Sequence, residues 1–181
     1  MSKVCIIVGS RRNGNSLKLA ELIKDSFKKD RIISNIITPG NQKIFLCTGC
    51  MDCDVNGKCD FKDDMDENIN NILESDTLIF ISPTRWNLLS GDIKIFMDRL
   101  NPLYTPKKLK GKKMVSIVIG GKKKEEYSTE AALTSLNSFA DSAEMKVIYQ
   151  YQFNECLLAD DILEKSEEID KMIQELIKTI K

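Results

Sequence analysis

Histidine is absent from this sequence of 181 residues. Its absence excludes catalysis by Ser-His-Asp or Cys-His groups, and any metal site would have to use cysteine or carboxylate ligands. No apolar run approaches the roughly 18 residues that a membrane-spanning helix needs. Basic and acidic residues balance at 27 each, so the chain lacks the basic surplus of a nucleic-acid-binding domain. The composition therefore predicts a protein without membrane or nucleic-acid partners.

The first residues run directly into an apolar strand and show no signal-peptide pattern, so we expect a cytoplasmic protein. In that compartment the six cysteines are expected to be reduced thiols or metal ligands rather than disulfides. The length suits one well-buried domain. Residues 1–181 are therefore predicted to form a single domain with a cysteine-rich loop at about residues 44–64.

Apolar runs of strand length alternate with segments of helical periodicity. The runs are residues 4–9, 31–37, 77–82, 114–119 and 146–153. Such alternation predicts an α/β fold with a five-stranded parallel sheet and helices on both faces. Right-handed crossovers favour the flavodoxin-like strand order 2-1-3-4-5, which gives a three-layer sandwich. The loops after strands 1, 3 and 4 are then expected at the ligand-binding edge of the sheet.

Residues 9–16, Gly-Ser-Arg-Arg-Asn-Gly-Asn-Ser, connect the first strand to the first helix. A glycine turn at a helix N-terminus offers free backbone N–H groups, and the helix dipole favours an anion there. The spacing nearly matches the nucleotide-triphosphate loop, but Asn15 stands where that motif needs lysine. We therefore predict a monophosphate site. An ordinary turn capped by Asn15 or Ser16, or a nucleotide hydrolase, is the alternative.

Residues 82–87, Ser-Pro-Thr-Arg-Trp-Asn, follow the third strand. Their backbone N–H groups, polar side chains and one aromatic plane could line a flat heterocycle whose phosphate rests on the first loop. The alternative for Trp86 is that it packs on ordinary surface, because tryptophan is often largely buried for packing alone.

These two loops resemble those of the NADPH-dependent FMN reductases and iron–sulfur flavoproteins. The likeness covers residues 9–16, 82–86, 90–99 and the cysteine segment that ends at 62–65. It implies FMN as cofactor. The residues around the FMN phosphate would be Ser10, Arg12, Asn15, Ser16 and Leu17. The residues along the isoalloxazine ring would be Pro83, Thr84, Arg85, Trp86 and Asn87. Gly120 and Gly121, after the fourth strand, complete the predicted site. Arg85 stands where relatives usually carry tyrosine.

Four cysteines follow the pattern C-x2-C-x2-C-x5-C: Cys47, Cys50, Cys53 and Cys59. Bacterial ferredoxins use a related run, whereas zinc more often shows two separated pairs. The resemblance likewise implies a 4Fe–4S cluster. Free or disulfide-forming thiols and a zinc site remain alternatives at this stage. Cys5 and Cys156 are expected to be buried small apolar residues.

The resemblance implies a flavin-dependent oxidoreductase that transfers electrons between a reduced donor and an acceptor, with a 4Fe–4S cluster as a further cofactor. The flavin carries the chemistry, so no side chain is expected to act as acid or base. Acidic residues in and after the cysteine segment predict a low cluster potential, which suits a ferredoxin-like donor better than NAD(P)H. The alternatives are a cluster-free NAD(P)H:FMN or quinone reductase and a non-enzymatic flavodoxin-type carrier. Relatives form dimers or tetramers, so a homodimer or homotetramer is expected.

Overall fold

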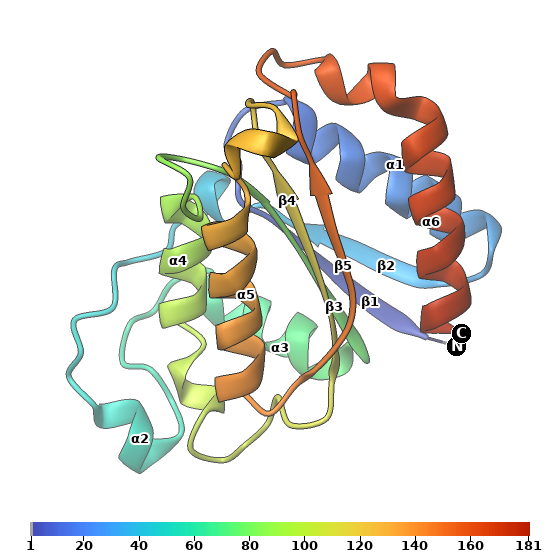
Figure 1. Ribbon diagram of the computed structural model, residues 1–181. Helices are drawn as coiled ribbons and strands as arrows, with labels where there is room; N and C mark the ends of the chain where they lie inside the picture. Colours follow the sequence, from blue (N-terminus) through green and yellow to red (C-terminus); the bar gives the residue numbers. More distant parts are fainter. Residues whose placement is uncertain (1) are drawn as a thin grey trace.

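The computed structural model describes residues 2–181. Its strands form one parallel sheet in the order β2-β1-β3-β4-β5, which confirms the predicted topology (Figure 1). The strands are β1 (Lys3–Val8), β2 (Ile33–Ile37), β3 (Thr77–Pro83), β4 (Lys113–Ile119) and β5 (Lys146–Phe153). β2 begins two residues later than predicted because Arg31 adopts a left-handed backbone with φ 60° at the end of the preceding helix.

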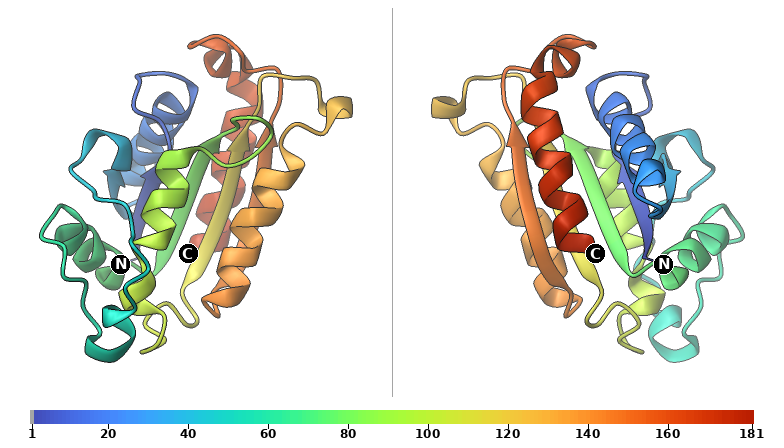
Figure 2. Two further views of the ribbon diagram at one scale, coloured as in Figure 1. Left: turned by 90° about the vertical axis from the view of Figure 1, so that its left-hand side faces the viewer. Right: turned by 90° about the vertical axis from the view of Figure 1, so that its right-hand side faces the viewer.

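Helices cover both faces of the sheet, as predicted (Figure 2). They are α1 (Asn15–Lys29), α2 (Asp52–Asn56), α3 (Met65–Glu74), α4 (Gly91–Asp98), α5 (Glu130–Ser142) and α6 (Ser166–Ile180). Short 3-10 helices are η1 (Pro39–Asn41), η2 (Asn101–Leu103), η3 (Lys124–Glu126) and η4 (Asp161–Lys165). Within residues 2–181, no helix is both long and apolar enough to cross a bilayer.

The core lies on both sides of the sheet because successive side chains of a strand point to opposite faces. In β1, Val4, Ile6 and Val8 pack with α1 and α6, whereas Cys5 and Ile7 pack with α3, α4 and α5. The central strands β1 and β3 are buried along almost their whole length. Their near-continuous apolar runs are those expected of a parallel sheet covered on both faces.

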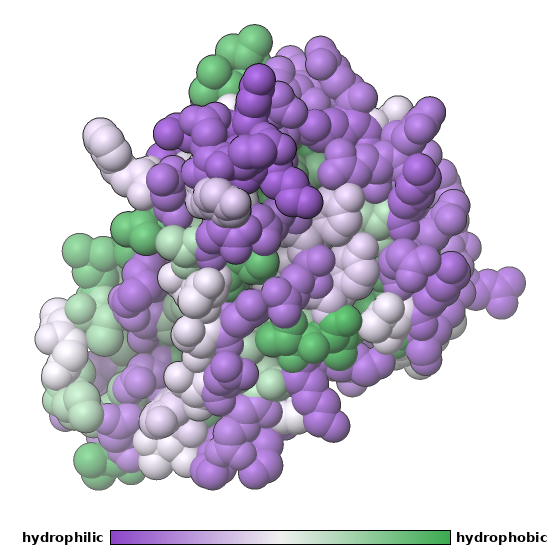
Figure 3. All heavy atoms as spheres, viewed as in Figure 1, coloured by the Kyte–Doolittle hydropathy of each residue, from purple (hydrophilic) through white to green (hydrophobic). Residues whose placement is uncertain are grey.

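The segment from residue 44 to residue 64, which we call the cysteine loop, departs from this layered plan. It leaves the carboxyl edge of the sheet after η1, runs past α4 and forms α2 near the opposite end (Figures 1 and 2). Pale and green surface gathers on this side of the molecule, whereas the α6 side is mostly hydrophilic (Figure 3). Exposed apolar residues of the loop are Phe45, Leu46, Met51 and Val55.

Candidate functional site

The turn between β1 and α1 holds the predicted phosphate-binding residues. The backbone N–H of Gly9 donates to the carbonyl of Ile81 at 2.9 Å, so the chain leaves β1 still attached to β3. A Cβ on Gly9 would lie 2.4 Å from Ser90 Oγ and from Ile93 Cγ1. Close packing against the start of α4 therefore requires glycine at this position.

The N-terminus of α1 keeps donors available for an anion. Its N-cap residue is Gly14, and within residues 2–181 no side chain caps the helix. The first N–H groups of a helix have no intrahelical partners, and the helix dipole favours negative charge at this end. Ser10 and Ser16 are buried beside the turn and add hydroxyl groups. This combination of donors fits a phosphate group.

The two arginines of the turn differ in their partners. Arg11 Nη2 lies 2.9 Å from Asp92 Oδ1, an ion pair that joins the turn to the first turn of α4. Arg12 is exposed and forms no ion pair with any residue of the described chain. Of the two arginines of this turn, Arg12 is the one without an ion pair in the described chain, and its role as a phosphate ligand stays a prediction.

Asn15 is engaged within the fold. Its Nδ2 donates to the carbonyl oxygens of Leu158, at 2.7 Å, and Cys156, at 3.1 Å. Its Oδ1 accepts from the backbone N–H of Ile162 at 3.2 Å. These bonds join α1 to the segment after β5. The place of Asn15 in the cofactor site stays a prediction, although the fold already engages its side-chain amide.

A cleft of about 110 Å³ lies at the carboxyl edge of the sheet between the predicted phosphate turn and the predicted flavin loop. Eight predicted cofactor residues line it: Ser10, Arg12, Asn15, Ser16, Pro83, Thr84, Arg85 and Gly121. The other four, Leu17, Trp86, Asn87 and Gly120, lie outside its lining. The structure therefore brings residues of the three predicted loops together at one place.

Trp86 and Asn87 form the tip of a tight hairpin. Arg85 and Leu88 exchange two backbone hydrogen bonds of 2.9 Å, and the two residues between them have φ values of 51° and 61°. Positive φ at both central positions defines a type I′ turn. Trp86 is 97% exposed, so it does not pack on ordinary surface as the alternative interpretation proposed.

The glycines after β4 have separate surroundings. Gly121 lines the cleft beside Leu157. A Cβ on Gly120 would lie 2.7 Å from Thr129 Cγ2 and 2.8 Å from Ser128 Oγ, so this glycine allows the two ends of the connection between β4 and α5 to approach closely. The hydroxyl of Ser128 is buried and has no hydrogen-bond partner in the described chain. A polar group that can still form a hydrogen bond thus lies next to the candidate flavin loops.

The four cysteines of the cysteine loop line one hollow of about 40 Å³. Cys47 and Cys50 are exposed, Cys59 is partly exposed and Cys53 is buried. Within residues 2–181, no three cysteine or carboxylate side chains meet closely enough to hold a single metal ion. A four-iron cluster binds its thiolates at separate irons, so its ligands are spaced more widely than those of one ion. Four thiols around one hollow are the donor set that a four-iron cluster uses.

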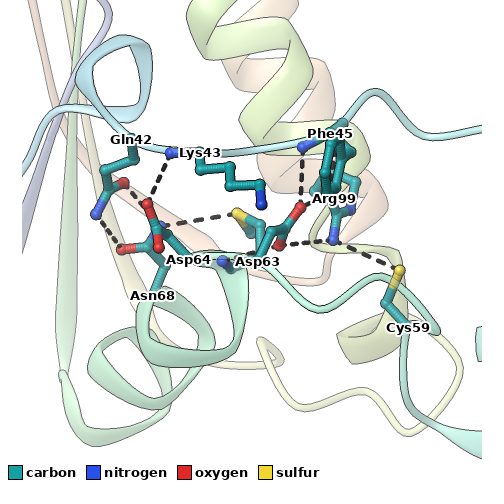
Figure 4. Close-up of polar contacts among 9 residues, drawn as sticks. Gln42, Lys43, Phe45, Cys59, Asp63, Asp64, Asn68 and Arg99 are labelled. Carbon is teal, nitrogen blue, oxygen red and sulfur yellow. Dashed lines mark hydrogen bonds and ion pairs between the residues drawn. The ribbon is translucent and has the colours of Figure 1, made fainter.

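Side chains hold the two ends of the cysteine loop together (Figure 4). The buried guanidinium of Arg99, just after α4, donates from Nη1 to Asp63 Oδ2 at 2.6 Å and to the carbonyl of Phe45 at 2.8 Å. Burial alone would raise the pKa of Asp63. Hydrogen bonds from Arg99 and from the backbone N–H groups of Phe45 and Met65 outweigh it and lower that pKa below its ordinary value.

The remaining cysteines are buried, as expected. Burial raises the pKa of Cys5 to about 12, although a hydrogen bond with Asn35 acts in the opposite direction. Burial also raises the pKa of Cys156 to about 11. Both thiols therefore stay protonated near neutral pH, and protonated thiols are poor nucleophiles.

A larger hollow of about 840 Å³ lies beside the cysteine loop, away from the predicted cofactor-binding residues. Its walls come from Cys47 and Met51, the end of α4, the segment 100–109 and the end of α5. The segments that line this hollow and the loops that line the cleft lie toward opposite ends of the sheet (Figure 1).

Several residues at the two sites were not found from the sequence. Cys156 and Leu157 line the cleft, and Arg99 and Asn101 contact cysteines of the loop. Cys156 and Leu157 follow β5, whose carboxyl end lies at the same edge of the sheet as the other ligand loops. The predicted topology could therefore have indicated these two residues. Arg99 and its partner Asp63 both lie in segments that carry the resemblance, but they are 36 residues apart and neither segment indicates that they pair.

Comparison with known proteins adds evidence from outside the structure. The model of the family described as NADPH-dependent FMN reductase matches residues 2–157. An iron-sulfur flavoprotein of Archaeoglobus fulgidus is 34% identical over 119 residues, covering 66% of this chain and 54% of that protein. One of Methanocaldococcus jannaschii is 31% identical over 119 residues, covering 65% of this chain and 62% of that protein. The chain thus matches little more than half the length of these curated relatives.

Solved structures show the same fold. A flavone reductase superposes with a TM-score of 0.77 at 19% identity, over 98% of this chain and 62% of that one. A WrbA-like flavodoxin from Agrobacterium tumefaciens superposes with a TM-score of 0.63 at 13% identity, over 100% of both chains. These likenesses confirm the flavodoxin-like architecture predicted from the sequence.

Proposed function

Because this chain belongs to the NADPH-dependent FMN reductase family, we propose that it is a flavin oxidoreductase that binds FMN at the carboxyl edge of the sheet. In this proposal it transfers electrons between a reduced donor and an acceptor, and the cysteine loop carries a 4Fe–4S cluster. When bound, FMN supplies the redox chemistry, since it can take up a hydride or single electrons. The chain itself supplies binding, orientation and electrostatics.

The observation that carries the FMN proposal is the cleft that joins the phosphate turn to the loop after β3. The uncapped N-terminus of α1, the hydroxyls of Ser10 and Ser16 and the unpaired Arg12 would hold the phosphate. Pro83, Thr84 and Arg85 extend the cleft along the edge of the sheet, where the ring would lie. Trp86 and Asn87 are proposed to contact the ring or a partner from the hairpin tip.

Two observations support the cluster. Four cysteines of one loop face the same hollow, and two curated relatives carry the name iron-sulfur flavoprotein. Cys47, Cys50, Cys53 and Cys59 would be its ligands. A cluster-free reductase of the same family is the alternative, and it shares the FMN cleft but leaves the four thiols without a metal.

The same proposal covers the electron donor, the oligomeric state and the cellular location of the protein. The family description favours a nicotinamide donor, NAD(P)H, whereas a cluster would also permit a ferredoxin-like protein. We propose a homodimer or homotetramer in the cytoplasm. The apolar surface on the cysteine-loop side offers area for such an interface (Figure 3).

Anaerobic purification tests the two cofactors separately. We expect one FMN per chain, about four iron and four acid-labile sulfides, and a broad absorbance near 400 nm beyond the flavin bands. FMN without iron would favour the cluster-free reductase. Steady-state oxidation of NADH and NADPH with FMN present separates an enzyme from a carrier, because a carrier of the flavodoxin type should show almost no turnover. Protein that binds neither FMN nor riboflavin would overturn the proposal.

A further inference from the structure

The four cysteines of the cysteine loop fall into two pairs with different surroundings. Arg99 Nη2 lies 3.5 Å from Cys59 Sγ, and Asn101 Nδ2 lies 3.1 Å from Cys53 Sγ, so each of these sulfurs accepts an N–H hydrogen bond. Cys47 and Cys50 are exposed, and within residues 2–181 their sulfurs have no such bond. One half of the candidate cluster site is therefore anchored and the other half is free.

Arg99 is held rigidly enough to place Cys59. Its two Nη atoms engage both oxygens of Asp63, at 2.6 and 3.1 Å, and Nη1 also donates to the carbonyl of Phe45. Only 2% of the residue is exposed, and the guanidinium lies 5.1 Å from the centroid of the Phe61 ring. With the planar fork fixed in this way, the direction of the second Nη2 N–H toward Cys59 is set before any ligand binds (Figure 4).

Asn101 places Cys53 in the way that Arg99 places Cys59. It begins η2, and its Nδ2 also donates to Asp54 Oδ1 at 3.1 Å. Thr105 Oγ1 donates to the same oxygen at 3.2 Å. The segment after α4 thus holds α2, the short helix that contains Cys53, through two side chains.

We propose that Arg99 and Asn101 are positioning residues of the cysteine site, which hold the sulfurs of Cys59 and Cys53 through N–H···S hydrogen bonds. The part of this proposal that concerns a bound cluster rests on the proposed function and adds to it the residues that hold two of the ligand sulfurs. Hydrogen bonds to a cluster sulfur favour the more negative, reduced state and raise its potential. Because Arg99 neutralises Asp63 as well, the two residues counteract the low potential expected from the acidic residues of this segment.

The first experiment measures thiol reactivity in metal-free protein under reducing conditions. Limiting iodoacetamide followed by peptide mass spectrometry should label Cys47 and Cys50 about tenfold faster than Cys53, with Cys5 and Cys156 as buried references. Asn101→Ala should change the labelling rate selectively at Cys53, and Arg99→Lys should do so at Cys59. Unchanged rates, or an equal change at all four cysteines of the loop, would overturn the proposal.

The second experiment uses protein loaded anaerobically with ferrous iron and sulfide. Asn101→Ala should lower the cluster potential, so that the reduced-to-oxidised ratio at a fixed potential falls about threefold to tenfold in a titration followed by electron paramagnetic resonance. The FMN potential in the same sample is the internal reference. Asn137→Ala is the matched control, because Asn137 lies on α5 and donates to Gln150 on β5, away from the cysteines.

The two experiments separate this inference from the proposed function. Selective labelling in protein that takes up no cluster would support the positioning role and reject the cluster. A cluster whose potential and thiol labelling are the same in wild type, Asn101→Ala and Arg99→Lys would keep the proposed function and reject the positioning role.

Discussion

Backbone hydrogen bonds that prolong the sheet hold the turns of the cleft. The cysteine loop is held mainly by side chains, with one backbone bond at its ends from the N–H of Asp64 to the carbonyl of Lys43. After β1, β3 and β4, the N–H groups of Gly9, Thr84 and Gly120 each donate to the neighbouring strand at 2.8–2.9 Å. The ends of the cysteine loop meet through Arg99 and Asp63. The cleft is thus a product of the fold, while the cysteine site depends on a few long-range side-chain contacts and should respond far more to single substitutions.

The largest expected effect comes from removing the carboxylate that compensates Arg99. Asp63→Ala leaves a buried guanidinium unpaired, which should cost about 3–5 kcal/mol and open the cysteine loop. Hydrogen exchange and limited proteolysis should show the loss of protection over residues 44–64, with FMN binding at the cleft retained. Asp92→Asn, which breaks the exposed pair with Arg11, is the control and should leave the loop protected. Equal loss of protection throughout the chain would contradict the separation of the two regions.

The second expected effect is confined to the cleft. Replacing Arg12 and Ser16 together with alanine should weaken FMN binding by about two orders of magnitude, because each charge-assisted bond to a phosphate is worth roughly 1.5–3 kcal/mol. Riboflavin, which lacks the phosphate, should bind almost as before. Calorimetric titration with FMN and with riboflavin measures the two dissociation constants. Equal losses for the two would reject the phosphate assignment, and the double variant should leave the cysteine loop unaltered.

A smaller effect should distinguish the structural role of Asn15 from a ligand role. Asn15→Ala leaves the backbone groups of residues 156, 158 and 162 without their side-chain partner, which should cost roughly 1–3 kcal/mol of stability. We expect a lower melting temperature with the preference for FMN over riboflavin retained. If that preference disappeared while the melting temperature stayed constant, the amide would be a phosphate ligand.

The smallest change in stability is expected at the hairpin tip. Arg85 and Trp86 are both largely exposed, so Arg85→Tyr and Trp86→Ala should leave the melting temperature nearly unchanged. If these residues face the flavin or its partner, the same variants should shift the flavin potential or the kinetics with the donor. Voltammetry and NAD(P)H kinetics measure the two quantities. A large drop in melting temperature with normal redox behaviour would instead mark the tip as structural.

The sequence by itself determined the layered fold and indicated the loops that form both candidate sites. Strand periodicity, the glycine turn at residues 9–16 and the cysteine spacing are local patterns, so they can be recognised without knowledge of distant neighbours. The strand order then follows from the few topologies that right-handed crossovers allow. The single-domain prediction and the assignment of each cofactor ligand stay predictions.

Only the tertiary structure decided which side chains remain available at those sites. It pairs Arg11 with Asp92 and, within residues 2–181, gives Arg12 no ion pair, although the two arginines are adjacent in the sequence. It directs the amide of Asn15 to a carbonyl 141 residues away. Arg99 likewise reaches Asp63 across 36 residues and separates anchored from free cysteines. Such choices depend on contacts between distant segments, which form only when the sheet and its helices pack, and no local pattern of residues encodes them.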